Sequence, residues 1–77
     1  MKYEEINIDD RVIYIGPTDP DKKIIKGGKG VVTSKWSTCI QVKFDSKDTW
    51  NFYDNEGYEY LGLKNLVPEI KYKWEDL

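Results

Sequence analysis

Polar and apolar residues alternate along much of this chain with a period of two. The clearest run is Ile40-Gln41-Val42-Lys43-Phe44-Asp45, which predicts a β-strand with one buried and one solvated face. No segment longer than about ten residues shows the three- and four-residue spacing of an amphipathic helix. Similar patterns predict further strands at 11–15, 30–36, 50–53, 58–61 and 70–74, with Val12, Tyr14 and Val32 facing the core.

Turn residues separate these predicted strands. Gly16-Pro17-Thr18-Asp19-Pro20 opens a loop that reaches Gly28, because proline cannot donate to a strand ladder and aspartate favours local turns. The tract 54–57 predicts a tight hairpin between 50–53 and 58–61, with Gly57 at positive φ. We expect a single 3₁₀ turn at 63–66, after which the strand at 70–74 would pair with the first strand.

The predicted layout of five to six short antiparallel strands, a long first loop and a late 3₁₀ turn resembles an SH3-like barrel. The residues that carry this resemblance are Asp10-Arg11-Val12-Ile13-Tyr14, Gly28-Lys29-Gly30-Val31-Val32, Val42-Lys43-Phe44-Asp45 and Leu63-Lys64-Asn65-Leu66. Residues 8–32 are similar to the KOW pattern, although Asp9 stands where that pattern has a glycine. The resemblance implies an all-β barrel that contacts RNA, the transcription machinery or other proteins.

The proline-rich-peptide branch of this superfold is a poorer match. Its Ala-Leu-Tyr-Asp-Tyr signature is missing from the chain, and the first long loop is basic after Asp21, where that branch is acidic. We therefore do not expect a polyproline helix as the ligand.

Composition narrows the function further. A chain of 77 residues can form one domain, spanning 1–77, with little room for an enclosed substrate cavity. The chain has no histidine and one cysteine, Cys39, so we expect no metal site, no cofactor and no intramolecular disulfide. Without histidine the commonest general base is missing, which favours a non-enzymatic protein without a small-molecule substrate.

The distribution of apolar residues bears on location. The longest apolar run is Val12-Ile13-Tyr14-Ile15, far below the roughly 20 residues that span a bilayer. The residues after Met1 do not resemble a signal peptide, and a secreted domain of this size usually carries disulfides. We expect a cytoplasmic protein that does not enter membranes.

The 11 aromatic residues divide between a core and a surface. We expect Tyr14, Phe44, Phe52 and Tyr60 to be buried because a domain this small needs large rings in its core. Trp36, Trp50, Tyr53 and Trp74 are the aromatics expected to be exposed. Aromatic rings rimmed by carboxylates are suited to a basic protein surface, which predicts a protein-binding site at Trp50, Tyr53, Asp54, Glu56, Tyr58 and Glu59.

The formal net charge of −2 hides a basic middle segment. Residues 21–47 contain seven lysines and two aspartates. This block supports an alternative nucleic-acid site in which lysines hold phosphates and a tryptophan stacks on a base, comprising Lys22, Lys23, Lys26, Lys29, Lys35, Trp36 and Lys43. A single arginine and a pI near 5.0 weigh against it.

The sequence therefore favours an all-β, SH3-like protein-interaction module, with a KOW-like module that binds nucleic acid, the ribosome or the transcription machinery as the alternative. The lysine-rich, alanine-free and arginine-poor composition is compatible with an AT-rich genome, and a short chain with one small barrel is typical of accessory proteins of phages or mobile elements. In that setting the module would bind and occlude a host or defence protein.

Overall fold

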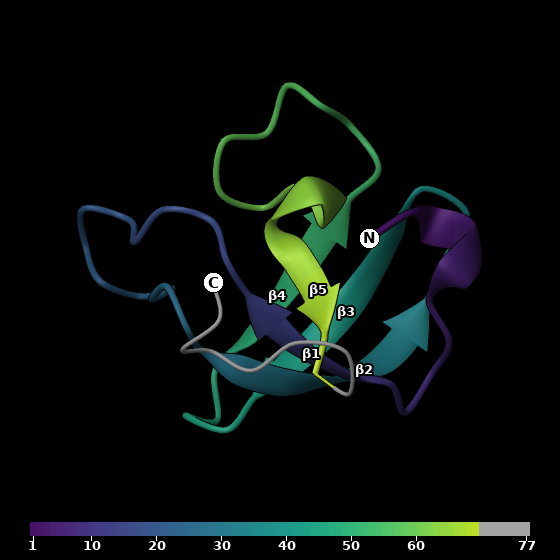
Figure 1. Cartoon of the computed structure of the whole chain (residues 1–77), viewed down its shortest axis with the longest axis horizontal. Coiled ribbons are helices and arrows are strands. Elements are labelled where there is room, and N and C mark those ends of the chain that lie inside the picture. Colours follow the sequence, from purple (N-terminus) through teal and green to yellow (C-terminus); the bar gives the residue numbers. More distant parts are fainter. Residues whose placement is uncertain (70–77) are drawn as a thin grey trace.

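The computed structural model describes residues 1–69 as an all-β fold built on one antiparallel sheet. The strand order is β4-β3-β2-β1-β5; one 3₁₀ helix precedes β1 in the sequence and another lies between β4 and β5 (Figure 1). The elements are η1 (Tyr3–Glu5), β1 (Arg11–Tyr14), β2 (Lys29–Lys35), β3 (Cys39–Phe44), β4 (Thr49–Tyr53), η2 (Leu63–Asn65) and β5 (Leu66–Pro68). This confirms the all-β class, the antiparallel pairing and the late 3₁₀ turn; the predicted strand at 70–74 lies outside the described residues.

The core forms where the period-two pattern predicts it. Val12, Tyr14 and Val32 are fully buried, and the even-numbered residues of β3 are buried beside them. Phe52 lies at the centre of the aromatic packing, with ring centroids 6.0 Å from Tyr14 and 6.0 Å from Phe44. Each large side chain buried in this way contributes about 1.5–3 kcal/mol of hydrophobic stabilisation.

The predicted hairpin between 50–53 and 58–61 is wrong. β4 forms, but residues 54–61 make an irregular loop, and Gly57 is not among the residues with positive φ. Asn55 Oδ1 accepts a hydrogen bond from Gly57 N at 2.8 Å, so the Asn55 side chain stabilises a local turn. The Asn65 side chain then bonds the Glu59 and Tyr60 carbonyls, which removes them from any strand ladder.

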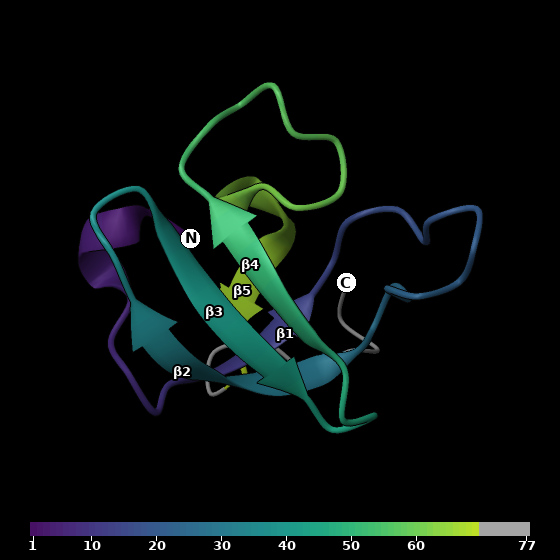
Figure 2. The same cartoon turned by 180° about the vertical axis from the view of Figure 1, so that it is seen from behind.

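Two long connections stand out from the sheet. The segment from Ile15 to Gly28 joins β1 to β2, and the segment from Asp54 to Gly62 joins β4 to η2; both project from the upper half of the view, on the opposite side from the short turn between β3 and β4 (Figures 1 and 2). We call them the first loop and the 54–62 loop. Within residues 1–69, no helix is long and apolar enough to cross a membrane.

Candidate functional site

An aromatic groove lies between the first loop and the 54–62 loop. Its volume is about 250 Å³. The side chains that line it are mostly apolar or aromatic, with two carboxylates, and together with Gly57 they are Asp19, Ile24, Trp50, Tyr58, Glu59, Tyr60 and Leu61. We call this the acidic aromatic groove, since three aromatic rings and two carboxylates line it and no lysine or arginine of residues 1–69 does.

Asn65 in η2 holds both walls of this groove. Its Nδ2 donates to the carbonyl oxygens of Glu59 at 2.8 Å and Tyr60 at 2.9 Å. Its backbone oxygen accepts from Ile15 N at 2.7 Å, at the start of the first loop. A Cβ atom at Gly16 would lie 2.5 Å from Asn65 Cγ, so only glycine allows the first loop to pass this close. The two loops are therefore tied to one buried asparagine.

The first loop is folded so that Asp19 and Ile24 face the groove. Asp19 N donates to Ile24 O at 3.1 Å, and Asp19 Oδ1 accepts from Lys23 N at 2.8 Å. The Tyr14 hydroxyl donates to Pro17 O at 2.7 Å and fixes the start of the loop. Ile24 is buried although it lies in a lysine-rich loop, so it anchors the loop against the core.

Negative charge gathers at this place. Burial, followed by the charge of Asp19 and smaller effects of Tyr60 and Glu59, raises the pKa of Tyr14 to about 12. Carboxylates from two loops far apart in the sequence thus act on one phenol. The groove combines apolar and aromatic walls with the carboxylates of Asp19 and Glu59.

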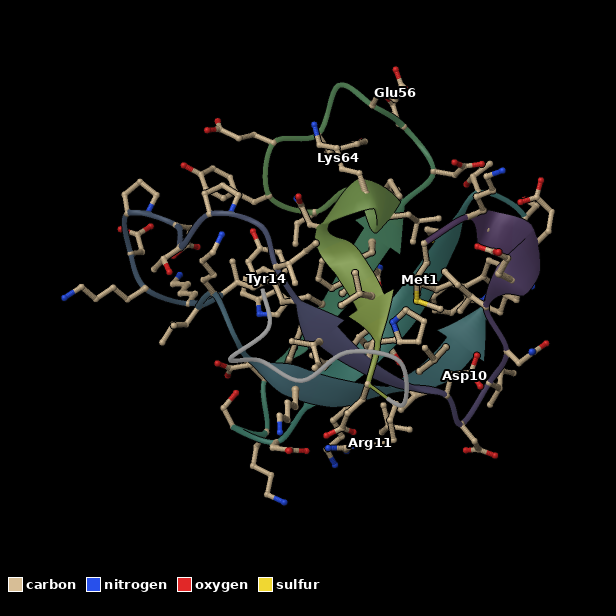
Figure 3. The ribbon with its side chains drawn as sticks, viewed as in Figure 1. Met1, Asp10, Arg11, Tyr14, Glu56 and Lys64 are labelled. Carbon is tan, nitrogen blue, oxygen red and sulfur yellow. The ribbon has the colours of Figure 1, made fainter. Side chains whose placement is uncertain are left out.

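The predicted protein-binding residues are divided by the 54–62 loop. Trp50, Tyr58 and Glu59 line the acidic aromatic groove, whereas Tyr53, Asp54 and Glu56 line another groove of about 590 Å³ with the N-terminal residues 1–5. Figure 3 shows Glu56 at the outer end of the loop, with Lys64 between it and the sheet. The rings of Tyr53 and Tyr58 stack with centroids 4.7 Å apart and link the two flanks.

The aromatic residues differ in part from expectation. Trp36 is 47% exposed, as predicted. Trp50 and Tyr53 are half-buried, Tyr60 is half-buried and packs at the margin of the core, and Trp74 lies outside the described residues. Trp50 Nε1 is buried and has no hydrogen-bond acceptor among the residues that the structure describes.

Sequence reasoning missed five groove residues, which are Asp19, Ile24, Gly57, Tyr60 and Leu61. The sequence predicts Tyr60 in the core and Asp19 only as a turn former. The one local signal was the pair Ile24-Ile25 inside a polar loop, since an isoleucine there needs a buried contact.

The lysine block does not form one continuous surface. Lys22, Lys23, Lys26 and Lys29 line a groove of about 400 Å³ that also contains Asp45 and Asp48. Within it, Lys26 Nζ donates to Ile15 O at 2.9 Å, and Lys29 Nζ lies 3.5 Å from a carboxylate oxygen of Glu69.

The remaining predicted nucleic-acid residues lie elsewhere. Lys35 ends β2, donates to Ile6 O at 2.7 Å and sits 4.5 Å from the centroid of the Tyr3 ring. Trp36 follows it and accepts a hydrogen bond from the Tyr3 hydroxyl through its carbonyl oxygen. Lys43 is exposed on β3, opposite Val31 of β2. The seven predicted residues are therefore spread over the first loop, both ends of β2 and the exposed side of β3.

Arg11 forms a separate polar cluster at the opposite end of the molecule from Glu56 (Figure 3). Its guanidinium bonds both carboxylate oxygens of Asp45 at 3.1 Å and Glu69 Oε2 at 3.0 Å. These hydrogen bonds hold the pKa of Asp45 and of Glu69 below their usual values. Among residues 1–69, no group of three or more Asp, Glu or Cys side chains is arranged to hold a metal ion.

The fold has a partial likeness to a known protein structure. No protein-family model matches the chain, and no curated protein matches it. The fold is similar to part of a solved structure described as "Structural Basis for DNA Unwinding at Forked dsDNA by two coordinating Pif1 helicases", with 25% sequence identity and a TM-score of 0.55. The match covers 66% of this chain, and this chain covers 13% of that one, so the likeness concerns one small part of a much larger protein.

Proposed function

We propose that this chain is a non-enzymatic, SH3-like interaction module that docks on a protein partner through the acidic aromatic groove. The groove itself carries the proposal, because it joins three aromatic rings and two carboxylates in a space of about 250 Å³. The strand order and the 3₁₀ turn before β5 support the SH3-like description. In a phage or mobile-element setting, the partner would be a host or defence protein whose site the module occludes.

The arrangement resembles the centre of a protein interface in its chemistry. Tyr58 is 40% exposed, while Trp50 and Tyr60 are half-buried, so their rings present apolar area and are already held by contacts with the fold. Rigid aromatic side chains lose little conformational entropy on binding and dominate interface energetics. Glu59 at the rim favours a partner surface of positive charge.

Site-specific photo-crosslinking tests this proposal. A benzophenone amino acid placed at Tyr58 should yield a discrete protein adduct in extracts of the native host, and nuclease treatment should not remove it. The same label at Trp36, a ring of similar exposure (47% against 40% for Tyr58) that does not line the groove, is the matched control. Equal adduct patterns at Tyr58 and Trp36, or no adduct at either position, would refute the groove as the docking site.

A second candidate function is attachment to DNA, favoured by the likeness to the helicase chain. Lys22 and Lys23 are exposed on the first loop and would contact the phosphate backbone. Asp45 and Asp48 line the same groove and oppose an anionic ligand. Fluorescence anisotropy with forked DNA over a salt series distinguishes the candidates, since phosphate contacts give a steep loss of affinity with salt and the protein-docking proposal predicts no such binding.

A further inference from the structure

β4 is an edge strand whose outer side, over most of its length, has no backbone partner among residues 1–69. The sheet order places β4 and β5 at the two edges. At the end of β4, Tyr53 N donates to Leu61 O at 2.8 Å, and Tyr53 forms a bridge with Gly62. The remainder of β4, before Tyr53, has no such cover from the 54–62 loop.

The hydrogen-bond pattern shows which backbone groups of β4 face outward. Phe44 N donates to Asp48 O at 2.8 Å, and Asp54 N donates to Thr38 O at 3.0 Å. Residues of an antiparallel ladder alternate between bonding to one neighbour and facing the other side. The even-numbered residues of β4 therefore bond to β3, and the N–H and C=O groups of Thr49 and Asn51 face outward. Residues 1–69 provide no backbone partner for them on that side.

The opposite edge of the sheet, formed by β5, is protected by hydrogen bonds within the chain and by a proline. On β5, Leu66 N bonds to Leu63 O, Leu66 O accepts from the Met1 ammonium at 2.8 Å, and Pro68 has no N–H to offer. Natural edge strands are usually protected in such ways, by proline, by lysine or by shortness. β4, with the sequence Thr-Trp-Asn-Phe-Tyr, has neither proline nor lysine. The difference singles out β4 as the edge open to an added strand.

Two grooves adjoin this open edge. The acidic aromatic groove includes Trp50 of β4. A groove of about 450 Å³ without charged residues includes the alternate β4 residues Thr49, Asn51 and Tyr53, and Gln41, Trp50 and Leu61 complete its lining. Trp50 and Leu61 line both, so the two grooves meet along β4. We call the second one the neutral groove.

We propose that the protein partner adds an extended segment to the open edge of β4 and places a lysine or arginine side chain in the acidic aromatic groove. This deepens the proposed function and rests on it. Successive side chains of a strand point to opposite faces, so the residue beside the basic one enters the neutral groove and is uncharged. Main-chain hydrogen bonds to Thr49 and Asn51 supply affinity, and the charge of Asp19 and Glu59 selects the basic side chain.

Short capped peptides of alternating threonine and valine test this proposal directly. The central residue is lysine, glutamine or glutamate, and a fourth peptide carries the lysine together with N-methylated backbone amides on one edge. Titrations are followed by the backbone amide resonances of the 54–62 loop and the indole N–H of Trp50. Amide hydrogen exchange of Thr49 and Asn51 is measured in the free and peptide-saturated protein.

We expect the lysine peptide to bind at least about tenfold more tightly than the glutamate peptide, with the glutamine peptide between them. Saturation should slow exchange at Thr49 and Asn51 by about tenfold or more, because both amides enter a new ladder. N-methylation should abolish binding. Glu59→Gln should reduce the preference for lysine, while Glu56→Gln, on the same loop but the other flank, should leave it unchanged.

Several results would overturn the proposal. Equal binding of the lysine and glutamate peptides, or binding without protection of Thr49 and Asn51, contradicts charge selection or strand addition respectively. Strong protection of both amides in the free monomer means that the chain covers its own edge, and protection that rises with protein concentration assigns the edge to a second copy. A Tyr58 adduct without any peptide binding would reject strand addition and leave groove docking in place.

Discussion

Replacing Asn65 by aspartate isolates the contact that holds the groove together. The substitution preserves shape but replaces the Nδ2 donor by a carboxylate oxygen, which then faces the Glu59 and Tyr60 carbonyls at 2.8 and 2.9 Å. A hydrogen bond contributes about 1 kcal/mol net, and acceptors left without a donor cost more, so Asn65→Asp should lower the free energy of unfolding by about 2–3 kcal/mol. For a domain of this size, that corresponds to a decrease in Tm of about 10–20 °C.

Asn55→Asp is the matched control for this experiment. Asn55 uses its side-chain oxygen as an acceptor from Gly57 N, and aspartate retains that acceptor. Both variants replace asparagine by aspartate. Only Asn65→Asp should lower Tm markedly, since Asn55→Asp should change the free energy of unfolding by no more than about 0.5 kcal/mol. Thermal unfolding followed by circular dichroism measures both. Equal shifts in Tm would refute the assignment of Asn65 as the donor that joins the loops.

The low-pH behaviour of Asn65→Asp gives an independent check. Burial raises the pKa of the introduced carboxyl in the folded state above its unfolded value. The protonated acid regains one donor. The loss of unfolding free energy relative to the wild-type protein should therefore narrow as pH falls through the raised pKa of the folded state and widen as pH rises through it. A deficit independent of pH would contradict a carboxylate facing carbonyl oxygens.

Three other properties can be measured on the same protein. Gly30→Ala should lower the free energy of unfolding by about 1–3 kcal/mol, because the new Cβ would lie 2.7 Å from a backbone carbonyl oxygen of β3. Gly57→Ala, in the exposed 54–62 loop, should change it by no more than about 0.5 kcal/mol. Denaturant unfolding measures both, and the reverse ranking of the two variants would contradict this packing. Arg11 bonds the Glu69 carboxylate and lowers its pKa, so this stabilisation is present above the unfolded pKa and is lost as pH falls through the folded pKa. Arg11→Gln should flatten the acid side of the stability profile, and an unchanged slope would exclude the ion pair as its cause. Tyr14→Phe should cost about 1 kcal/mol and remove from the spectrophotometric titration the phenol whose pKa is about 12; retention of that phenol would assign it to another tyrosine.

Much of the sheet could be predicted from local pattern, because strand periodicity is a property of neighbouring residues. The alternation in 40–45 predicts which side chains of β3 are buried, and Gly16 and Pro17 predict where β1 must end. The 54–62 loop could not be predicted in this way. Its residues carry turn and strand signals suited to a hairpin, but the donor that captures Glu59 O and Tyr60 O is Asn65, in the following 3₁₀ turn.

The sequence by itself determined the all-β class, the limits of β1 to β4 to within one residue, the buried face of β3 and the supply of aromatic and acidic side chains near Trp50, but not the burial of Ile13 on the second face of β1. Only the tertiary structure decided that Asp19 and Ile24 join the segment 58–61 in one groove, that the lysines spread over separate surfaces, and that the outer edge of β4 has no backbone partner before Tyr53 among residues 1–69. The physical reason is that periodicity records which side of a strand is buried. The position of a loop depends instead on hydrogen bonds and packing between residues that are distant in the sequence, and these form only in the assembled fold.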